Sequence, residues 1–120
     1  MNLLFVCVGN SCRSQMAEGI ARSLGYNASS AGTHPASLVN STAIIACEEI
    51  GIDISKQIPK NVDEFFAKDF DLVISMGCGV SCPDMRIDQD WELEDPFEQS
   101  VDVYRNTRDE IQRRLESLVS

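Results

Sequence analysis

The sequence is poor in basic residues and has no long apolar run. Its 10 Lys and Arg residues are outnumbered by 19 Asp and Glu, and the formal net charge of -9 opposes binding to duplex nucleic acid or to an anionic membrane. No apolar run approaches the roughly 20 residues that cross a bilayer. The N-terminus lacks the basic region and the apolar length of a signal peptide. We therefore expect a cytoplasmic protein that binds neither nucleic acid nor a membrane.

Histidine is nearly absent, which limits what the five cysteines can do. An odd number of cysteines in a reducing compartment argues against a framework of structural disulfides. Cys78 and Cys82 are spaced as half of a tetrahedral zinc site, but the other cysteines lie far away in sequence and His34 has no partner at ligand spacing. We expect no bound metal, and we interpret His34 as a solvated loop residue and Cys47 as a core residue.

The 120 residues are expected to form one domain, 1–120, because no repeat, low-complexity tract or linker divides them. Short apolar segments predict strands at 3–6, 27–31, 71–76 and 91–93. Apolar residues at a helical period predict helices at 14–24, 38–50 and 101–119 and a short helix at 62–67, with Ser14 capping the first. This alternation indicates right-handed βαβ units. The expected fold is a single-domain three-layer α/β/α fold with a four-stranded parallel sheet.

Ligands of such folds bind beyond the C-terminal ends of the strands. Segments 7–14, 76–83 and 95–97 each follow an expected strand, so we expect them to meet at that edge of the sheet. These segments hold the residues with the most distinctive chemistry in the chain.

The segment that begins at Cys7 and ends at Ser14 has the pattern of an oxyanion cradle. It runs from a strand through a loop with Gly9 to a helix start, so backbone N–H groups and the positive helix end can surround a tetrahedral anion. Loop donors, Arg13 and the Ser14 hydroxyl would favour the thiolate form of Cys7, and the Arg13 fork can hold two oxygens. The expected oxyanion-binding residues are Val8, Gly9, Asn10, Ser11, Cys12, Arg13 and Ser14.

A purely structural interpretation is that Cys7 is a buried strand cysteine and Arg13 a surface charge. The strand, the glycine loop, the C-x5-R spacing and the helix start together favour the anion site. Asp95 precedes Pro96, whose fixed φ stiffens the turn, and is the candidate general acid for a leaving oxygen above Cys7. The alternative for Asp95 is an ordinary Asp-Pro turn or helix entry.

Cys78 and Cys82 form a candidate redox pair. One helical turn would place their Cα atoms about 6 Å apart, within reach of a disulfide, and either thiol could attack a soft adduct on Cys7 by exchange chemistry. The alternative is a pair of buried small apolar residues. Cys12 is equally consistent with packing under the loop and with a protective disulfide to Cys7 under oxidation.

These residues resemble a known family. Segment 6–19, VCVGNSCRSQMAEG, closely resembles the signature of arsenate reductases that share the low-molecular-weight protein tyrosine phosphatase fold. The agreement continues at 30–32, 51–55, 71–75 and 94–96, and so covers nearly the whole chain. Gln15 and segment 76–83 look like the reductase branch.

The resemblance implies an enzyme in which Cys7 attacks arsenate, Asp95 protonates the departing oxygen, and a second thiol takes over the adduct and releases arsenite. Two electrons leave as a disulfide, for which Cys78 and Cys82 are the candidate thiols in this chain. No cofactor is expected to be bound. Thioredoxin, glutaredoxin or a low-molecular-weight thiol serves as the external reductant. We expect a monomer that binds a small oxyanion and meets its redox partner transiently.

The chain also differs from that reductase pattern. Cys78 and Cys82 are closer together than the redox cysteines of the thioredoxin-coupled branch, segment 57–60 lacks the threonine and aspartate that help to bind potassium in some reductases, and Phe97 stands where phosphatase relatives have an aromatic residue. Two alternatives therefore remain. The first is hydrolysis of phosphotyrosine or phosphoarginine through a phospho-cysteine, and the second is an oxyanion sensor that does not need the Cys7 thiol.

Overall fold

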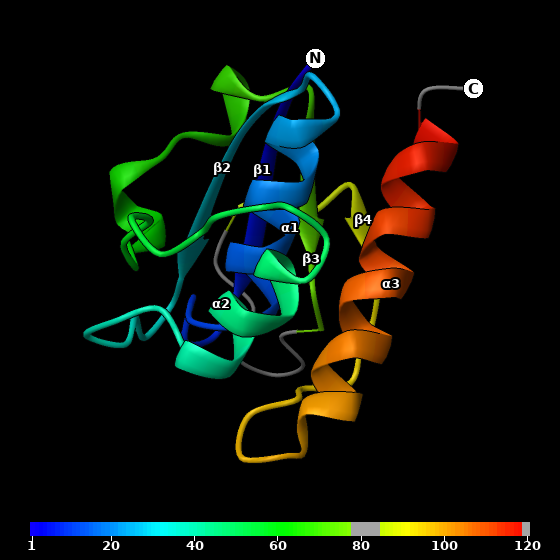
Figure 1. Cartoon of the computed structure of the whole chain (residues 1–120). Helices are drawn as coiled ribbons and strands as arrows, with labels where there is room; N and C mark the ends of the chain where they lie inside the picture. The colour runs from blue at the N-terminus through cyan, green and yellow to red at the C-terminus, as the bar shows by residue number, and fades with distance from the viewer. Residues whose placement is uncertain (78–84, 119–120) are drawn as a thin grey trace.

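The computed structural model describes residues 1–77 and 85–118 and is built on a parallel sheet in the order β2-β1-β3-β4. Three α-helices and two 3-10 helices complete the fold of these described residues (Figure 1). The strands are β1 (Asn2–Cys7), β2 (Asn27–Gly32), β3 (Leu72–Ser75) and β4 (Gln89–Asp90), and the helices are α1 (Arg13–Ser23), α2 (Ser41–Glu48) and α3 (Val101–Leu118). The four-stranded parallel sheet expected from the sequence is confirmed.

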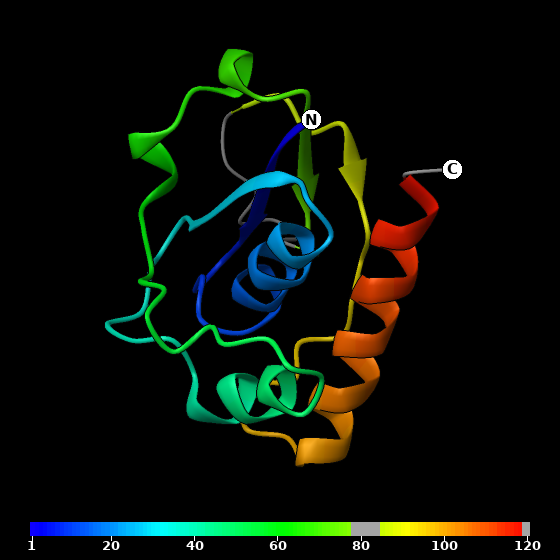
Figure 2. The ribbon, with the colours of Figure 1, turned by 45° about the horizontal axis from the view of Figure 1, so that its top comes forward.

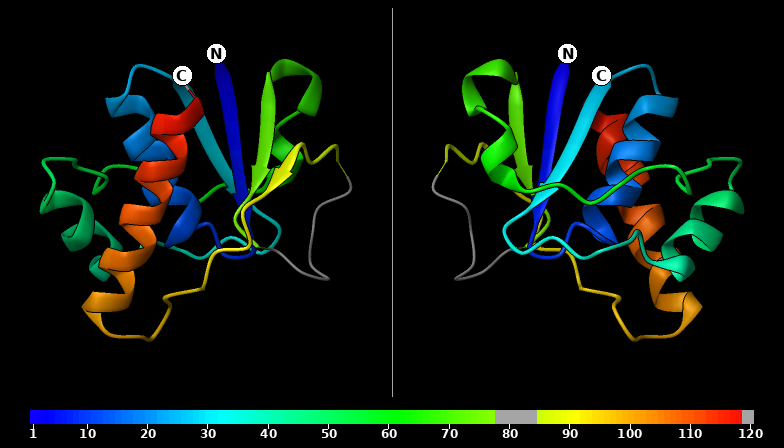
Figure 3. Two further views of the ribbon diagram at one scale, coloured as in Figure 1. Left: turned by 90° about the vertical axis from the view of Figure 1, so that its right-hand side faces the viewer. Right: turned by 90° about the vertical axis from the view of Figure 1, so that its left-hand side faces the viewer.

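The sheet is covered on both faces, as a three-layer fold requires. Figure 3 shows α1, α2 and α3 on one face, while the segment with two 3-10 helices, Val62–Glu64 and Ala67–Asp69, lies on the other. Helix α3 packs against both α1 and α2 (Figure 2). In the part of the chain that the structure describes, no helix is long and apolar enough to cross a membrane.

The two faces of β1 fill two separate cores. Leu3 and Phe5 belong to the larger core under the helices, and Leu4 and Val6 to a smaller one under the 3-10 segment. All four side chains are fully buried. An uninterrupted apolar strand is stable here because successive side chains point to opposite faces and both faces are covered.

The fourth strand is the clearest correction to the sequence prediction. It occupies Gln89–Asp90 instead of 91–93. The Trp91 N–H still donates to the Ser75 carbonyl at 2.9 Å, but Glu92 has a φ of 47°, which breaks the extended ladder. Trp91 is buried and its ring centroid lies 6.0 Å from that of Phe5, so it serves the core beside the strand.

Three helix predictions are also corrected at their ends. Helix α1 begins at Arg13 after Cys12, and Ser14 does not cap it. Helix α2 begins later than expected because the Asn40 side chain accepts from the N–H groups of Thr42 and Ala43. The helix expected at 62–67 is two separate 3-10 turns, because Phe65 is extended between them.

Glu49, at the end of α2, ties that helix to α3. Its carboxylate accepts from Arg105 Nη2 at 2.7 Å and from Arg108 Nη1 at 2.8 Å. Hydrogen bonds from Arg105, and then from Arg108, lower the pKa of Glu49 from 4.5 to about 2. Because the folded-state pKa is the lower one, the ionised carboxylate stabilises the fold above about pH 4.5 and this contribution is lost as the pH falls toward about 2.

We therefore expect Glu49→Gln to lower the melting temperature at neutral pH and to match the wild type in strong acid. Thermal unfolding of both proteins across this range measures the difference. A gap between the two melting temperatures that stays constant down to about pH 2 would contradict the assignment.

Candidate active site

The loop between β1 and α1 forms the floor of a cavity at the C-terminal edge of the sheet. The cavity has a volume of about 260 Å³, and Asp95 and Phe97 also line it. Residues 7–13, Ala36, Asp95 and Phe97 line it. The structure therefore brings together the Cys7, Arg13 and Asp95 that the sequence singled out. Cys78 and Cys82 lie outside the described residues.

Cys7 is the last residue of β1 and is almost completely buried. Its sulfur lies 3.1 Å from the Asn10 backbone nitrogen, which donates to it, and 2.9 Å from the Ser14 hydroxyl oxygen. Asn10 has a φ of 49°, so the loop has a left-handed residue at this position. The Cys7 sulfur therefore has one backbone donor and one hydroxyl within hydrogen-bond distance, beside the loop that begins α1.

Arg13 begins α1 and is 6% exposed. Its Nη1 donates to the carbonyl oxygens of Met76 at 2.8 Å, Leu93 at 2.9 Å and Gly77 at 3.3 Å. These contacts hold the guanidinium against the residues that directly follow β3 and against Leu93, which follows β4. A planar, fixed guanidinium is suited to binding two oxygens of one tetrahedral anion.

Asp95 lies on the open side of the cavity. Its side chain is 57% exposed, and Oδ2 lies 3.8 Å from Arg13 Nη2. Oδ1 accepts from the Phe97 N–H at 3.1 Å, so the carboxyl closes a turn around Pro96. A carboxyl held in this way can reach an anion bound above Cys7 while it exchanges protons with solvent.

The other described thiols are placed for packing. Cys12 is buried, its sulfur lies 3.7 Å from the Tyr104 hydroxyl of α3, and burial raises its pKa. Cys47 is fully buried in the core, where desolvation raises its pKa to about 12. The core prediction for Cys47 is confirmed, and His34 is an exposed loop residue as expected. Cys7, Cys12 and Cys47 are all free thiols.

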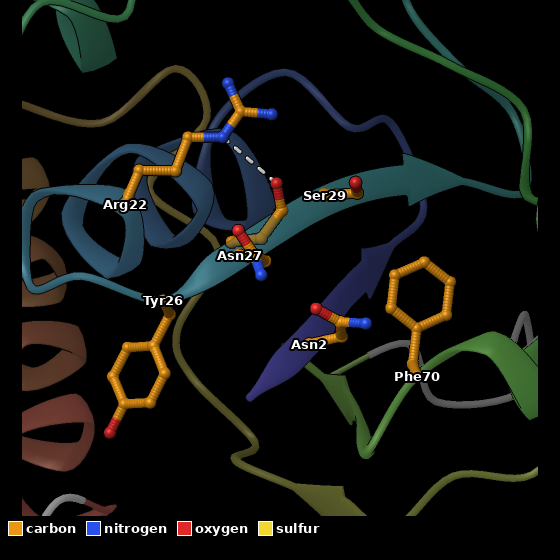
Figure 4. Close-up of a pocket in the computed structure, with 7 residues that line it drawn as sticks. Asn2, Arg22, Tyr26, Asn27, Ser29 and Phe70 are labelled. Carbon is orange, nitrogen blue, oxygen red and sulfur yellow. Dashed lines mark hydrogen bonds between the residues drawn. The ribbon is translucent and has the colours of Figure 1, made fainter.

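A larger cavity of about 450 Å³ lies at the opposite end of the sheet (Figure 4). Arg22 and Asn2 are among its lining residues, and Arg22 Nε donates to the Ala28 carbonyl at 3.0 Å. None of the described residues that line it is a cysteine. It therefore lacks the nucleophile that the smaller cavity has.

Within residues 1–77 and 85–118, no group of three or more His, Cys, Asp or Glu side chains could hold a metal ion.

The side chains of Asn10 and Gln15 were not foreseen as parts of the site's framework. Asn10 Nδ2 donates to the Ser14 oxygen at 2.7 Å, and the buried Gln15 amide donates to both the Asn10 carbonyl and the Asn10 Oδ1 at 3.1 Å. The sequence marked both positions, Asn10 through its backbone and Gln15 through the family resemblance. Neither signal specifies a side-chain contact.

Gly32, at the end of β2, lies close to the backbone of the loop between β1 and α1. A Cβ atom there would lie 2.5 Å from the Val8 carbonyl oxygen and 3.0 Å from the Asn10 nitrogen. Both contacts are to the backbone and cannot be relieved by a side-chain rotation. We expect Gly32→Ala to destabilise the fold by about 1–3 kcal/mol and to weaken phosphate binding, measured by denaturant unfolding and calorimetric titration. Unchanged phosphate affinity would contradict this coupling.

The chain belongs to the low molecular weight phosphotyrosine protein phosphatase family, whose model matches residues 2–120. It is 46% identical over 126 residues to the glutaredoxin arsenate reductase of a Synechocystis species, covering 98% of this chain and 95% of that protein. A solved structure described as an arsenate reductase in the phosphate binding state superposes with a TM-score of 0.89 at 45% identity, covering 98% and 95% of the two chains.

A low molecular weight protein tyrosine phosphatase from T. tengcongensis is less similar in sequence. It superposes with a TM-score of 0.83 at 33% identity, covering 99% of this chain and 97% of that one. The fold is thus shared by reductases and phosphatases, and the expected family and fold are confirmed.

Proposed function

We propose that this protein reduces arsenate to arsenite through an adduct on Cys7. The observation that carries the proposal is the Cys7 sulfur held between the Asn10 N–H and the Ser14 hydroxyl in a cavity that Arg13 and Asp95 also line. The similarity over nearly the whole chain to a glutaredoxin arsenate reductase supports arsenate as the substrate.

In the first step, the Cys7 sulfur attacks arsenic, a sulfur–arsenic bond forms, and one arsenic–oxygen bond breaks. Asp95 donates a proton to the departing oxygen, which leaves as water once protonated. Backbone N–H groups of residues 8–14 and the Arg13 guanidinium hold the remaining oxygens as their charge redistributes. Arsenic is still pentavalent at this point.

In the second step, another thiolate attacks the Cys7 sulfur, and a disulfide forms. The electron pair of the sulfur–arsenic bond goes to arsenic, which leaves as trivalent arsenite. Two thiols are oxidised for each arsenate reduced. Two external thiol groups then reduce the disulfide, the first by forming a mixed disulfide and the second by resolving it, and the external pair leaves as a disulfide.

We propose that Cys78 or Cys82 supplies the second thiol and that glutaredoxin, thioredoxin or a small thiol supplies the electrons in the cytoplasm. Glutaredoxin has direct support among these donors, because a relative at 46% identity is named for it. The described cysteines Cys12 and Cys47 are poorer candidates, since burial raises the pKa of both thiols.

Phosphatase activity is the second candidate function, and one observation favours it. Phe97 lies on the cavity wall and is 52% exposed, where it can contact an aromatic substrate. The same Cys7, Arg13 and Asp95 would form a phospho-cysteine, which water would then hydrolyse.

The deciding experiment supplies arsenate together with glutaredoxin and glutathione, thioredoxin, or a small thiol alone, and measures arsenite directly. A parallel reaction measures phosphate release from phosphotyrosine. We expect arsenite from at least one donor system and a slower phosphatase reaction. Brisk phosphate release with no arsenite from any donor would reverse the assignment. Cys78→Ser and Cys82→Ser variants, each trapped after one turnover, identify the second thiol by mass spectrometry.

A further inference from the structure

We propose that Gln57 is a positioning residue for Cys7, because its amide reinforces the direction of a network of hydrogen bonds that ends on the Cys7 sulfur. Gln57 lies on the segment before the first 3-10 helix, 42 positions from Gln15 in sequence. It does not line the cavity of Cys7. The inference rests on the proposed function for its effect on turnover, but its direct readout does not need turnover.

The chain of contacts starts at the Gln57 amide. Gln57 Nε2 donates to Gln15 Oε1 at 2.7 Å and to the Gln15 carbonyl at 3.0 Å. Gln15 Nε2 donates to Asn10 Oδ1 at 3.1 Å, and Asn10 Nδ2 donates to the Ser14 oxygen at 2.7 Å. That oxygen is 2.9 Å from the Cys7 sulfur.

Within this hydrogen-bond network, the side-chain amides of Gln15 and Asn10 each have only one favourable orientation. Gln15 Nε2 faces three acceptors, Asn10 Oδ1, the Asn10 carbonyl and the Ile58 carbonyl, so a flipped Gln15 would place oxygen against all three. Asn10 Oδ1 also accepts from the Lys60 backbone N–H at 2.8 Å, which fixes the Asn10 amide in the same sense. The orientations follow from donor and acceptor matching alone.

The consequence falls on the hydroxyl of Ser14. Because this oxygen accepts from Asn10 Nδ2, its hydrogen is available for the Cys7 sulfur, where it stabilises the thiolate. Hydrogen bonds that run in one direction strengthen one another in a buried site. Asn10, Ser14 and Gln15 are all fully buried. Gln57 is the half-buried amide of this network. Its donation to Gln15 Oε1 reinforces the orientation that the Asn10 and Ile58 acceptors give the Gln15 amide.

The packing around Gly19 gives Gln57 access to this position. A Cβ atom at Gly19 would lie 2.4 Å from Ile54 Cγ2 and 3.4 Å from Gln57 Oε1. Ile54 is fully buried against α1. The missing side chain at Gly19 thus lets the segment that carries Ile54 and Gln57 pack closely against the helix.

Charged and titratable groups near Cys7 also influence its reactivity, so a test must distinguish their influence from that of the Gln57 amide. Those near Cys7 in the described chain are Arg13 and Asp95 on the cavity wall, Cys12 in the loop, and Tyr104 of α3 beside Cys12. Lys56 is exposed beside Gln57, so a change there matches the charge of a Gln57 variant without touching the amide chain.

The test uses two variants and a control. Gln57→Glu keeps the shape and replaces the donor by an acceptor, and Gln57→Met keeps the length without any polar group. Lys56→Gln changes the net charge by the same amount as Gln57→Glu and keeps Gln57. The readout is the rate of Cys7 alkylation by iodoacetamide across pH, located on Cys7 by peptide mass spectrometry, with no arsenate present. Thermal unfolding confirms that each variant is folded.

We expect the pH midpoint of Cys7 alkylation to rise by about one unit in Gln57→Glu, which is about a tenfold lower rate near neutral pH. Gln57→Met moves it in the same direction, and Lys56→Gln leaves it unchanged. Under arsenate turnover, kcat falls about tenfold and KM changes less, because the donors that bind the oxyanion remain.

Two outcomes would overturn the inference. The first is that both Gln57 variants match the wild type in alkylation, and the second is that Lys56→Gln moves the midpoint as far as Gln57→Glu. The proposed function fails separately, if the wild type makes no arsenite with any donor while the alkylation midpoints still shift.

Discussion

Replacing Cys7 by serine is expected to lower arsenite formation by about four orders of magnitude or more, because Cys12, the other thiol among the described residues that line the cavity, has a pKa raised by burial. A serine hydroxyl at this position would receive the same two hydrogen bonds but would remain protonated at neutral pH. It also cannot form the disulfide through which arsenic gains its electrons. The measurement is arsenite produced per enzyme under the donor that supports the wild type.

Two further measurements distinguish loss of the nucleophile from loss of the anion site or of the fold. Phosphate is expected to bind Cys7→Ser nearly as well as the wild type, since the loop N–H groups and Arg13 are retained. Cys47→Ser serves as the matched control, because Cys47 is a fully buried core thiol of α2, and that variant should lose stability but keep its activity. Arsenite formation that survives in Cys7→Ser would favour the oxyanion sensor or a different nucleophile.

Arg13→Lys is expected to cost about 10²–10³ in kcat/KM despite the conserved charge. Lysine cannot reproduce the planar fork, nor can it keep its charge in place while it also satisfies the Met76 and Leu93 carbonyls that Arg13 Nη1 now contacts. The loss should appear in KM for arsenate, in the dissociation constant for phosphate, and in kcat. Steady-state kinetics and calorimetric phosphate titration measure these effects.

Arg22→Lys is the matched control for this change. Arg22 lies on the same helix, its side chain is 52% exposed, and it lines the cavity at the far end of the sheet. Its replacement should leave kcat/KM within about twofold of the wild type, because Arg22 does not line the cavity of Cys7 and lysine keeps the charge. Equal losses in Arg13→Lys and Arg22→Lys would indicate a general effect of arginine replacement on the fold.

The parts of the site that are continuous in sequence were predictable from the sequence. Segment 7–14 carries its own evidence, because a buried strand, a glycine loop and a helix start can be recognised within a few residues of one another. Asp95 was placed correctly near this loop because ligand-binding loops of parallel sheets share one edge. Its role as a general acid remains a prediction.

The errors come from backbone conformations and side-chain contacts that the residue pattern does not encode. The fourth strand was placed too late because the left-handed Glu92 cannot be recognised from sequence pattern. The layer on the second face is formed by 3-10 turns where a helix was expected, since Phe65 is extended and packs with Phe70. Gln57 had no signal, because its amide acts on Gln15 across 42 positions.

The central claim is that Cys7 is an ionised nucleophile inside a cradle made for a tetrahedral oxyanion. The most direct test is the rate at which iodoacetamide modifies Cys7 in the reduced, folded protein near neutral pH, with and without arsenate. We predict that Cys7 reacts well before Cys12 and Cys47, because burial raises the pKa of both of those thiols, and that arsenate slows the modification of Cys7 in a saturable manner. A Cys7 that reacts no faster than Cys47, or that arsenate does not protect, would contradict the account.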